Sequence, residues 1–569
     1  MVARYVVSPH GGRRAHRDIS SALHAAAQRG RPALVEIAPG RYEETLVVRG
    51  EVRLVAAEGP GTVVVGRHRG AALEAAGRVR VHGLTLVGRD ADAVACPAGT
   101  LTLEHTEIRA TGGVALHAGP HASVTLRDSV VAHGRTLFSG AAGLVERCRF
   151  TDAADNAIAV VAGARVRVGD SRIEGSRIHG LRVSDAQAEV VGCELTGTGR
   201  AALMADTGAH LTVADCVITT VHAEGVMFIE QSRGSVDRTR VTDARHGIAA
   251  ASGADPVVRG CVLADCRDTG INVQTDARGR FEDCEVLDSG NVAVFATDGG
   301  APEVRGCRVA RGNVGIAVTG GARGRFAHST VEDLTGSALR VWDGSRGVFE
   351  HLRVERCPTG LDTRGDGGTT ADLADTTFRD FRLPAVTAAG QSRVTLRRVT
   401  AERGTVGFGV AEDAQLFVYD CEVRAVTGGG VGGIGNGRLL ARNLTVTGSE
   451  GVGISAKDSA YLDVEGGDFT DCAVAGAVFD EESSGRLAEC SVSGERGAAV
   501  VHNGRVDLVA LRSGLRVVHR AAPPAAPAPT IVNRFLGPVI HGDVHDAQFA
   551  WDNDHVSQHL RTEGDDSPR

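Results

Sequence analysis

The stretch Arg259-Gly260-Cys261-Val262-Leu263, followed by Gly270-Ile271-Asn272-Val273, contains the two phrases that decide the fold of this chain. The first phrase has two polar or turn-forming positions, then a cysteine, and ends on aliphatic residues. The first phrase returns as Glu282-Asp283-Cys284-Glu285-Val286 and Arg305-Gly306-Cys307-Arg308-Val309, and the second as Asn291-Val292-Ala293-Val294 and Gly315-Ile316-Ala317-Val318. Recurrence at a nearly fixed spacing predicts a repeat architecture.

The cysteine position can be followed through most of the chain. Its occupants are mainly Cys, Ser, Thr or Asn, and the steps are 22 to 24 residues except for one of 19 that ends at Cys148. The predicted occupants are Gly83, Thr106, Ser129, Cys148, Ser171, Cys193, Cys216, Thr239, Cys261, Cys284, Cys307, Ser329, Leu352, Thr376, Arg398, Cys421, Asn443, Gly467 and Cys490. Stacked repeats would bury this column, in which a free cysteine acts as a small hydrophobe. Disulfides between consecutive repeats are the alternative.

Each repeat holds two or three short alternating stretches of β-branched residues, separated by Gly, Asp or Asn. This pattern is typical of strands and tight turns. A leucine-rich repeat has a similar period, but its LxxLxLxxN phrase and a helical spacing between strands are absent from the sequence. We therefore predict an all-β, single-stranded parallel β-helix, a solenoid of about 20 coils of 22–24 residues, whose rungs lie roughly 4.8 Å apart.

Composition agrees with a solenoid and narrows the function. Glycine accounts for 75 of 569 residues and aromatic residues for 4%, as expected for a narrow core filled by aliphatic side chains. The formal net charge of -8 disfavours nucleic acid as a ligand, and no apolar run is long enough to predict a membrane span. The 12 cysteines contain no CxxC pair, and the N-terminal residues contain no apolar signal-peptide core. We expect a cytoplasmic protein with reduced thiols.

The sequence divides into five segments. Residues 1–50 form an N-terminal cap, in which residues 18–30 are predicted to be a short amphipathic helix that ends at Gly30. Residues 51–518 form the β-helix. A Pro/Ala-rich linker is expected at 519–530, a short Gly/Val/His motif at 531–552, and a disordered tail at 553–569.

The helix and the following stretch Val35-Glu36-Ile37-Ala38-Pro39-Gly40-Arg41-Tyr42-Glu43-Glu44-Thr45-Leu46-Val47-Val48 resemble the opening of pectin-lyase-like proteins. The later repeats resemble the carbohydrate-binding and sugar-hydrolase (CASH) repeats of bacterial copper-maturation proteins, alginate epimerases and F-box β-helix proteins. The resemblance covers about residues 1–518 and implies a right-handed β-helix. The motif at 531–552 resembles short tails of multidomain bacterial signalling proteins.

The resemblance does not carry an activity with it. The residue sets of pectin methylesterases and polygalacturonases are not found, and the phrase closest to the epimerase motif, Asp543-Val544-His545-Asp546, lacks its proline. Fold alone does not imply function.

One row of turn residues is the best candidate for catalysis. Asp243, Asp265 and Asp288, followed by Arg311, stand four residues after the cysteine position of successive repeats. Carboxylates on neighbouring rungs could share Ca²⁺, with the arginine as base or charge clamp of a polyuronate lyase. The favoured interpretation is that Asp suits turns and that Arg offsets its charge.

A second candidate is the outward side of the Gly-Ile-x-Val strand. If Ile271 and Val273 point inward, the alternate residues point outward. In this register the large outward residues are Leu203, Met227, Ile229, Phe295, Arg340 and Trp342. Such residues could form a contact patch, although isolated exposed apolar residues are also normal.

These observations favour a non-catalytic β-helix scaffold or recognition module that binds a protein partner, or a glycan, along this face. The alternative is a polysaccharide lyase, hydrolase or epimerase acting on acidic glycans. No cofactor is expected, and Ca²⁺ only under the alternative. The sequence leaves the oligomeric state open.

Overall fold

The computed structural model describes residues 2–12, 15–67, 70–111, 113–493, 499–502, 505–509 and 516–519. The fold is an all-β parallel solenoid of about 20 turns with one short helix, which confirms the predicted fold class. Contacts divide the chain into unit 1 (Met1–Val286) and unit 2 (Leu287–Arg569). From residue 520 onward, the predicted linker, Gly/Val/His motif and tail lie outside the described residues.

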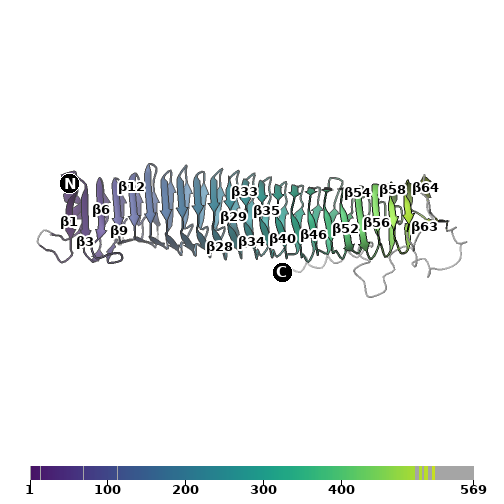
Figure 1. Ribbon diagram of the computed structural model, residues 1–569. Coiled ribbons are helices and arrows are strands. Elements are labelled where there is room, and N and C mark those ends of the chain that lie inside the picture. The colour runs from purple at the N-terminus through teal and green to yellow at the C-terminus, as the bar shows by residue number, and fades with distance from the viewer. Residues whose placement is uncertain are drawn as a thin grey trace, which may run out of the picture. The chain divides into compact units, whose positions relative to one another are not determined.

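One coil consists of three short strands, each of which pairs in parallel with its counterpart in the next coil (Figure 1). A coil of unit 1 contains β30 (Arg233–Asp237), β31 (Arg240–Thr242) and β32 (His246–Ala250). We call the surfaces built by these three kinds of strand face 1, face 2 and face 3. Each coil contributes one rung to each face.

The register between coils puts like residues on top of one another. The next coil contains β33 (Asp255–Arg259), β34 (Val262–Ala264) and β35 (Thr269–Val273). The pairs Val236 with Val258, Val241 with Leu263 and Ile248 with Ile271 join the two coils. All six side chains are fully buried, so the alternation in the sequence fills the interior with aliphatic columns.

Aromatic residues stack in the same way inside unit 2. Phe326 on β42 (Arg323–Ala327) pairs with Phe349 on β45 (Arg346–Glu350), and their rings stack at 5.2 Å with an interplanar angle of 16°. A Cβ on Gly347 would lie 2.5 Å from the Phe349 ring. The glycine that precedes this phenylalanine by two residues therefore makes room for its ring.

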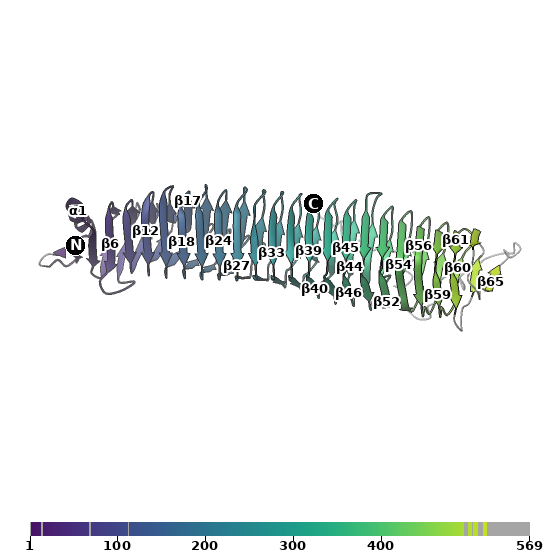
Figure 2. The same ribbon diagram turned by 45° about the horizontal axis from the view of Figure 1, so that its top comes forward.

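The helix α1 (Ile19–Arg29) covers the first strands of unit 1, as predicted (Figure 2). Asp18 caps its N-terminus by accepting a hydrogen bond from the Ser21 N–H, and Gly30 ends it in the left-handed region at φ +60°. The Glu44 carboxylate accepts from the Ile19 N–H at 2.8 Å. These contacts satisfy N–H groups that have no partner within the helix.

All twelve cysteines are buried free thiols. Successive members of the predicted column stack directly: the Cys193 N–H donates to the Cys216 sulfur at 3.4 Å, and the Cys148 N–H donates to the Ser171 hydroxyl at 3.0 Å. The disulfide alternative is therefore not supported, and most rungs of the column hold a small side chain such as Cys, Ser or Thr.

Three predicted members of the column are wrong by one residue. Gly83, Arg398 and Asn443 lie in the turn that precedes the column, with φ of +79°, +50° and +56°. The residues that fill the column at these rungs are Leu84, Val399 and Leu444, and each is fully buried. The steps vary by a residue or two, so spacing alone did not locate the turn.

We predict that none of the twelve thiols reacts with a disulfide reagent in the native protein at pH 8, whereas all twelve react after unfolding without reductant. Burial raises the pKa of Cys148 and of Cys421 to about 11, and the thiolate is the reactive form. Thiol titration with and without denaturant measures this. Fast native reaction, or fewer than twelve thiols after unfolding, would contradict the buried column.

Candidate functional site

The turn row that was the catalytic candidate is occupied by ion pairs. Arg311 binds Asp288 through two hydrogen bonds of 3.0 and 2.6 Å in unit 2. In unit 1, Arg267 donates to Asp243 at 2.9 Å. Asp265 has φ +52°, and the other members of the row also lie in the left-handed region, where Asp is favoured. The geometry agrees with the turn interpretation.

A metal centre has no support in the part of the chain that the structure describes. Within those residues no group of three or more His, Cys, Asp or Glu side chains could hold a metal ion.

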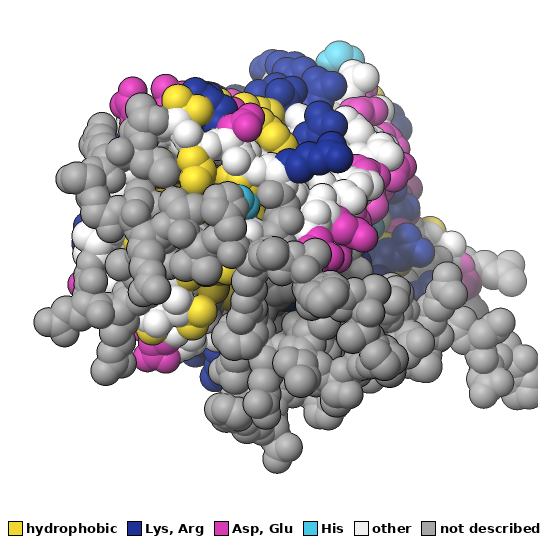
Figure 3. All heavy atoms as spheres, turned by 90° about the vertical axis from the view of Figure 1, so that its right-hand side faces the viewer, with side chains coloured by type: hydrophobic (Ala, Val, Ile, Leu, Met, Phe, Trp, Pro, Cys, Tyr) yellow, Lys and Arg dark blue, Asp and Glu magenta, His cyan; other side chains and the backbone are white. Residues whose placement is uncertain are grey.

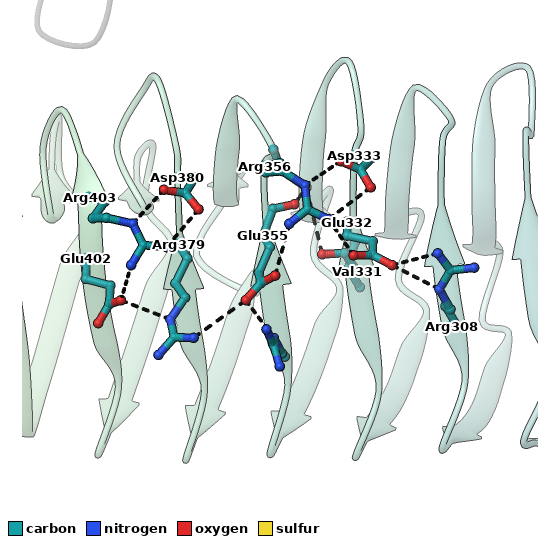
Figure 4. A network of polar contacts seen from close by, with 12 residues as sticks. Arg308, Val331, Glu332, Asp333, Glu355, Arg356, Arg379, Asp380, Glu402 and Arg403 are labelled. Carbon is teal, nitrogen blue, oxygen red and sulfur yellow. Dashed lines mark hydrogen bonds and ion pairs between the residues drawn. The ribbon is translucent and has the colours of Figure 1, made fainter.

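Face 2 of unit 2 carries a continuous network of ion pairs (Figure 4). Glu332 on β43 (Thr330–Glu332) and Glu355 on β46 (Arg353–Glu355) are register partners, so two carboxylates lie on neighbouring rungs. Arg356 lies between them and donates to Glu332 at 2.6 Å and to Glu355 at 3.1 Å. It also binds Asp333 at 2.5 and 3.0 Å. One turn arginine thus offsets the repulsion between stacked acids.

The network continues along the same face. Arg379 on β49 (Thr377–Arg379) lies 3.7 Å from Glu355 and 3.0 Å from Glu402 on β52 (Thr400–Gly404). Arg403 donates to Glu402 at 2.7 Å and to Asp380 at 2.8 Å. Figure 3 also shows Lys and Arg side chains next to Asp and Glu side chains on the surface that it presents. Ion pairing of this kind leaves little net charge to attract a ligand.

The outward side of face 3 differs from the other faces. Within the described part of unit 2, no ion pair involves a strand of face 3 from β38 (Val292–Ala296) to β60 (Ala475–Phe479). Five of the six residues predicted to point outward on face 3 are half-buried there. They are Met227 and Ile229 in unit 1, and Phe295, Arg340 and Trp342 in unit 2.

The outward placement of Leu203 is wrong. Leu203 on β26 (Leu203–Asp206) is fully buried and pairs with Leu181 and Val226 of the inward column. Met204 takes the outward position and pairs with Met227. A shift of one residue moves a strand side chain to the opposite face, and the spacing was misjudged by one residue at this rung.

Phe295 belongs to an apolar cluster on the outward side of unit 2. It packs against Val292, Val314 and Ala317, which are 6%, 1% and 2% exposed. These three residues belong to β38 and to β41 (Val314–Val318), the next rung of face 3. The cluster is apolar, and Phe295 is its partly exposed member.

Two rungs further along the same outward column lies a polar group. Arg340 and Trp342 are on β44 (Ser337–Trp342), and the Arg340 guanidinium lies over the Trp342 ring, 4.3 Å from its centroid. In the next rung, β47 (Thr359–Arg364), Asp362 pairs with Arg340 and Arg364 pairs with Trp342. We call Arg340, Trp342, Asp362 and Arg364 the face-3 quartet.

The quartet has an unsatisfied polar atom. The Arg340 Nε is buried and has no hydrogen-bond partner. Burial raises the pKa of the Asp362 carboxyl, whereas Arg340, Arg364 and Trp342 act in the opposite direction. The charges of Arg340 and Arg364 and a side-chain hydrogen bond with Trp342 favour the carboxylate. A donor left without an acceptor is unfavourable when buried, and a bound ligand could supply the acceptor.

The sequence analysis named two members of the quartet and missed the other two. Asp362 and Arg364 stand 22 residues after Arg340 and Trp342, at the same outward positions one coil later. The repeat period would have found them, but only large apolar or aromatic residues and one arginine were selected as outward candidates.

A hollow of about 560 Å³ lies at the cap of unit 1, between α1 and β5 (Leu46–Val48). Leu23, His24 and Val47 are among its lining residues. It is not part of the outward side of face 3 described for unit 2, and the sequence analysis assigned nothing to it.

Comparisons with known proteins agree with the architecture. The family described as right handed beta helix region matches residues 93–219, 200–357 and 359–510. The chain belongs to the right-handed beta helix family. No curated protein matches the sequence. The predicted resemblance to pectin-lyase-like β-helix proteins is confirmed at the level of the fold.

Solved structures with this fold include enzymes and an adhesin. The PL6 family alginate lyase AlyGC is 9% identical, with 91% of this chain and 99% of that chain covered and a TM-score of 0.33. The periplasmic alginate epimerase AlgG is 11% identical, with 66% and 77% covered and a TM-score of 0.25. PfbA, a surface adhesin of Streptococcus pneumoniae, is 8% identical, with 91% and 94% covered and a TM-score of 0.21. With TM-scores below 0.5, these similarities support no inference about this chain.

A search for membrane-spanning helices in the described residues found none of sufficient length and apolarity.

We predict that Glu355→Gln lowers the free energy of unfolding by about 1–2 kcal/mol, because three arginines then lose a common carboxylate. The Glu355 side chain is 9% exposed and interacts with Arg353, Arg356 and Arg379. Urea unfolding at pH 7 measures the change. Glu350→Gln is the matched control, since Glu350 pairs with Arg325 alone on face 1 and is 34% exposed; a loss below about 0.5 kcal/mol is expected for it. Equal losses would contradict the network.

The same variant has a predicted pH dependence. Hydrogen bonding from Arg353, and then the charges of Arg353 and Arg356, lower the pKa of Glu355. A carboxyl with a lowered folded-state pKa contributes stability above its unfolded pKa and loses it as the pH falls through the folded pKa. The wild type should therefore lose more stability than Glu355→Gln between pH 7 and acidic pH. Parallel urea curves at several pH values measure the difference, and identical pH profiles would contradict it.

Proposed function

We propose that the protein is a non-catalytic β-helix scaffold whose outward face 3 binds a protein partner. The observation that carries this proposal is the Phe295 cluster, an apolar cluster on face 3 of unit 2 whose phenylalanine is half-buried. Interfaces draw most of their binding energy from a few buried aromatic and arginine side chains. Phe295 and the Arg340–Trp342 pair provide such groups, two rungs apart on one face.

The other faces support the proposal by contrast. On face 2 of unit 2 the charged side chains already have partners within the chain, as the contacts of Arg356, Arg379 and Arg403 show. Binding there would require breaking internal ion pairs. Face 3 offers an apolar cluster and the unpaired Arg340 Nε, and binding there breaks no internal ion pair.

A protein is favoured over a glycan as the ligand. Glycan platforms usually rely on several exposed aromatic rings, and this chain has two Trp and four Tyr in all. The proposed compartment is the cytoplasm, since twelve free thiols suit a reducing environment.

The double variant Phe295→Ser/Trp342→Ser tests the assigned face. Affinity capture from an extract of the source cells, quantified by mass spectrometry, should show that a partner enriched by the wild type is reduced about tenfold or more, as expected for the loss of two interface anchors. Tyr461→Ser is the matched control, since Tyr461 is an aromatic residue of unit 2 that is 37% exposed on face 1. It should capture the partner as the wild type does.

Two results would overturn the proposal. Unchanged capture by a folded double variant, with its melting temperature within a few degrees of the wild type, would reject face 3. Cleavage or epimerisation of a polyuronate in the presence of Ca²⁺, abolished by Asp265→Asn, would establish instead the enzyme on acidic glycans that the sequence left as the alternative.

A further inference from the structure

The face-3 quartet has an excess of positive charge and of hydrogen-bond donors. Arg340 and Arg364 face one carboxyl, that of Asp362, and neither arginine forms an ion pair with it within 4.0 Å among the described contacts. The Arg340 Nε is buried without an acceptor, and the Arg340 guanidinium lies over the Trp342 ring at 4.3 Å from its centroid. A fitting ligand therefore brings carboxylates, which accept hydrogen bonds from guanidinium groups with good geometry, and an apolar group for the Trp342 ring.

The chain itself contains a segment with this chemistry. Residues 531–552 hold three aspartates, Asp543, Asp546 and Asp552, and one arginine, Arg534. Their formal charge is therefore -2 with His neutral. Two aromatic residues, Phe549 and Trp551, stand among the aspartates. The segment is complementary to the quartet in charge and in apolar character.

The length of the chain places this segment within reach. The last described strand, β65 (Arg516–His519), also belongs to face 3. Seven rung steps join β47 to β65, which is about 34 Å at 4.8 Å per rung. Residues 520–530 are rich in Pro and Ala, and eleven residues in a polyproline conformation span about 34 Å. A linker of this length, running back along face 3, would bring residue 531 to the rung of Asp362 and Arg364.

We infer that the face-3 quartet is the docking site of the chain's own acidic segment, residues 531–552. The carboxylates of the segment bind Arg340 and Arg364, and its aromatic side chains cover Trp342. Docking covers part of the surface that we propose for the partner, so the segment competes with the partner for face 3. The inference shares its location with the proposed function, but its test needs no partner.

The chain has two tryptophans, Trp342 in the quartet and Trp551 in the segment. In the full-length Trp551→Phe chain, Trp342 alone reports on docking. Adding Asp543→Asn, Asp546→Asn and Asp552→Asn should release the segment, because docking is driven by charge. Release exposes the Trp342 ring to solvent. The acrylamide quenching constant of Trp342 should then rise about threefold, and its emission should shift to longer wavelength. Unchanged quenching would overturn the inference.

The matched control neutralises three carboxylates beyond the segment. In the same Trp551→Phe chain, Asp554→Asn, Asp565→Asn and Asp566→Asn remove an equal charge but leave residues 531–552 intact. Quenching should stay at the level of the parent chain. An increase equal to that of the segment variant would show a general charge effect and reject the site.

Two further arms separate docking within one chain from docking between copies. The Trp342 quenching constant of the Trp551→Phe chain should not change on about 100-fold dilution, since a tethered segment has a constant effective concentration. An increase would instead assign the segment to a second copy.

A synthetic peptide of residues 531–552 with Phe at 551 should shield Trp342 in the released chain, and should fail to do so when Arg340→Gln and Arg364→Gln are added. Shielding that survives these substitutions would overturn the assignment to the quartet.

Discussion

The structure depends on the parallel hydrogen-bonded pairing of each coil with the next. A coil of this size has too few buried side chains to fold alone, so its backbone groups and its inward side chains must be satisfied by the neighbouring coils. Pairing in register then forces like side chains into columns. This constraint explains the buried aliphatic columns of each face, the stacking of Phe326 on Phe349, and the column of thiols and hydroxyls.

The same constraint acts on the outside, where stacking is less favourable for charged residues. Backbone pairing places Glu332 and Glu355 on neighbouring rungs, although their carboxylates repel each other. On face 2, arginines from the strands and from the turns offset this repulsion. Arg356, for example, contacts both carboxylates. Turn residues in the left-handed region are well placed for this purpose, since Asp333, Arg356, Asp380 and Arg403 all have φ near +55°. The row that suggested a catalytic site is part of this charge compensation.

On face 3 of unit 2, the outward side chains are not paired in this way. Its outward columns in unit 2 hold an apolar cluster around Phe295 and a quartet in which the buried Arg340 Nε lacks an acceptor. Residues that are not satisfied within the fold are the natural place to look for a ligand, because burying them unpaired has a cost that binding can remove. The proposed partner site and the proposed docking of residues 531–552 both rest on this difference between faces.

The sequence by itself determined the parallel β-helix, its period, the capping helix and the burial of the thiols, because each depends on a pattern in the sequence. These patterns are the alternation of period two, the repeat of about 23 residues, and an N-cap before a helical stretch. Five of the six residues that it placed on the outward side of face 3 are half-buried there. It failed at Leu203, Arg398 and Asn443, where the step between coils changes by one residue, and a shift of one turns an inward side chain outward. Only the tertiary structure decided which residues meet across rungs. Asp288 and Arg311 are 23 residues apart in sequence, and Arg340 and Asp362 are 22 apart. The ion pair of the first two and the register pairing of the second two depend on the backbone pairing between coils.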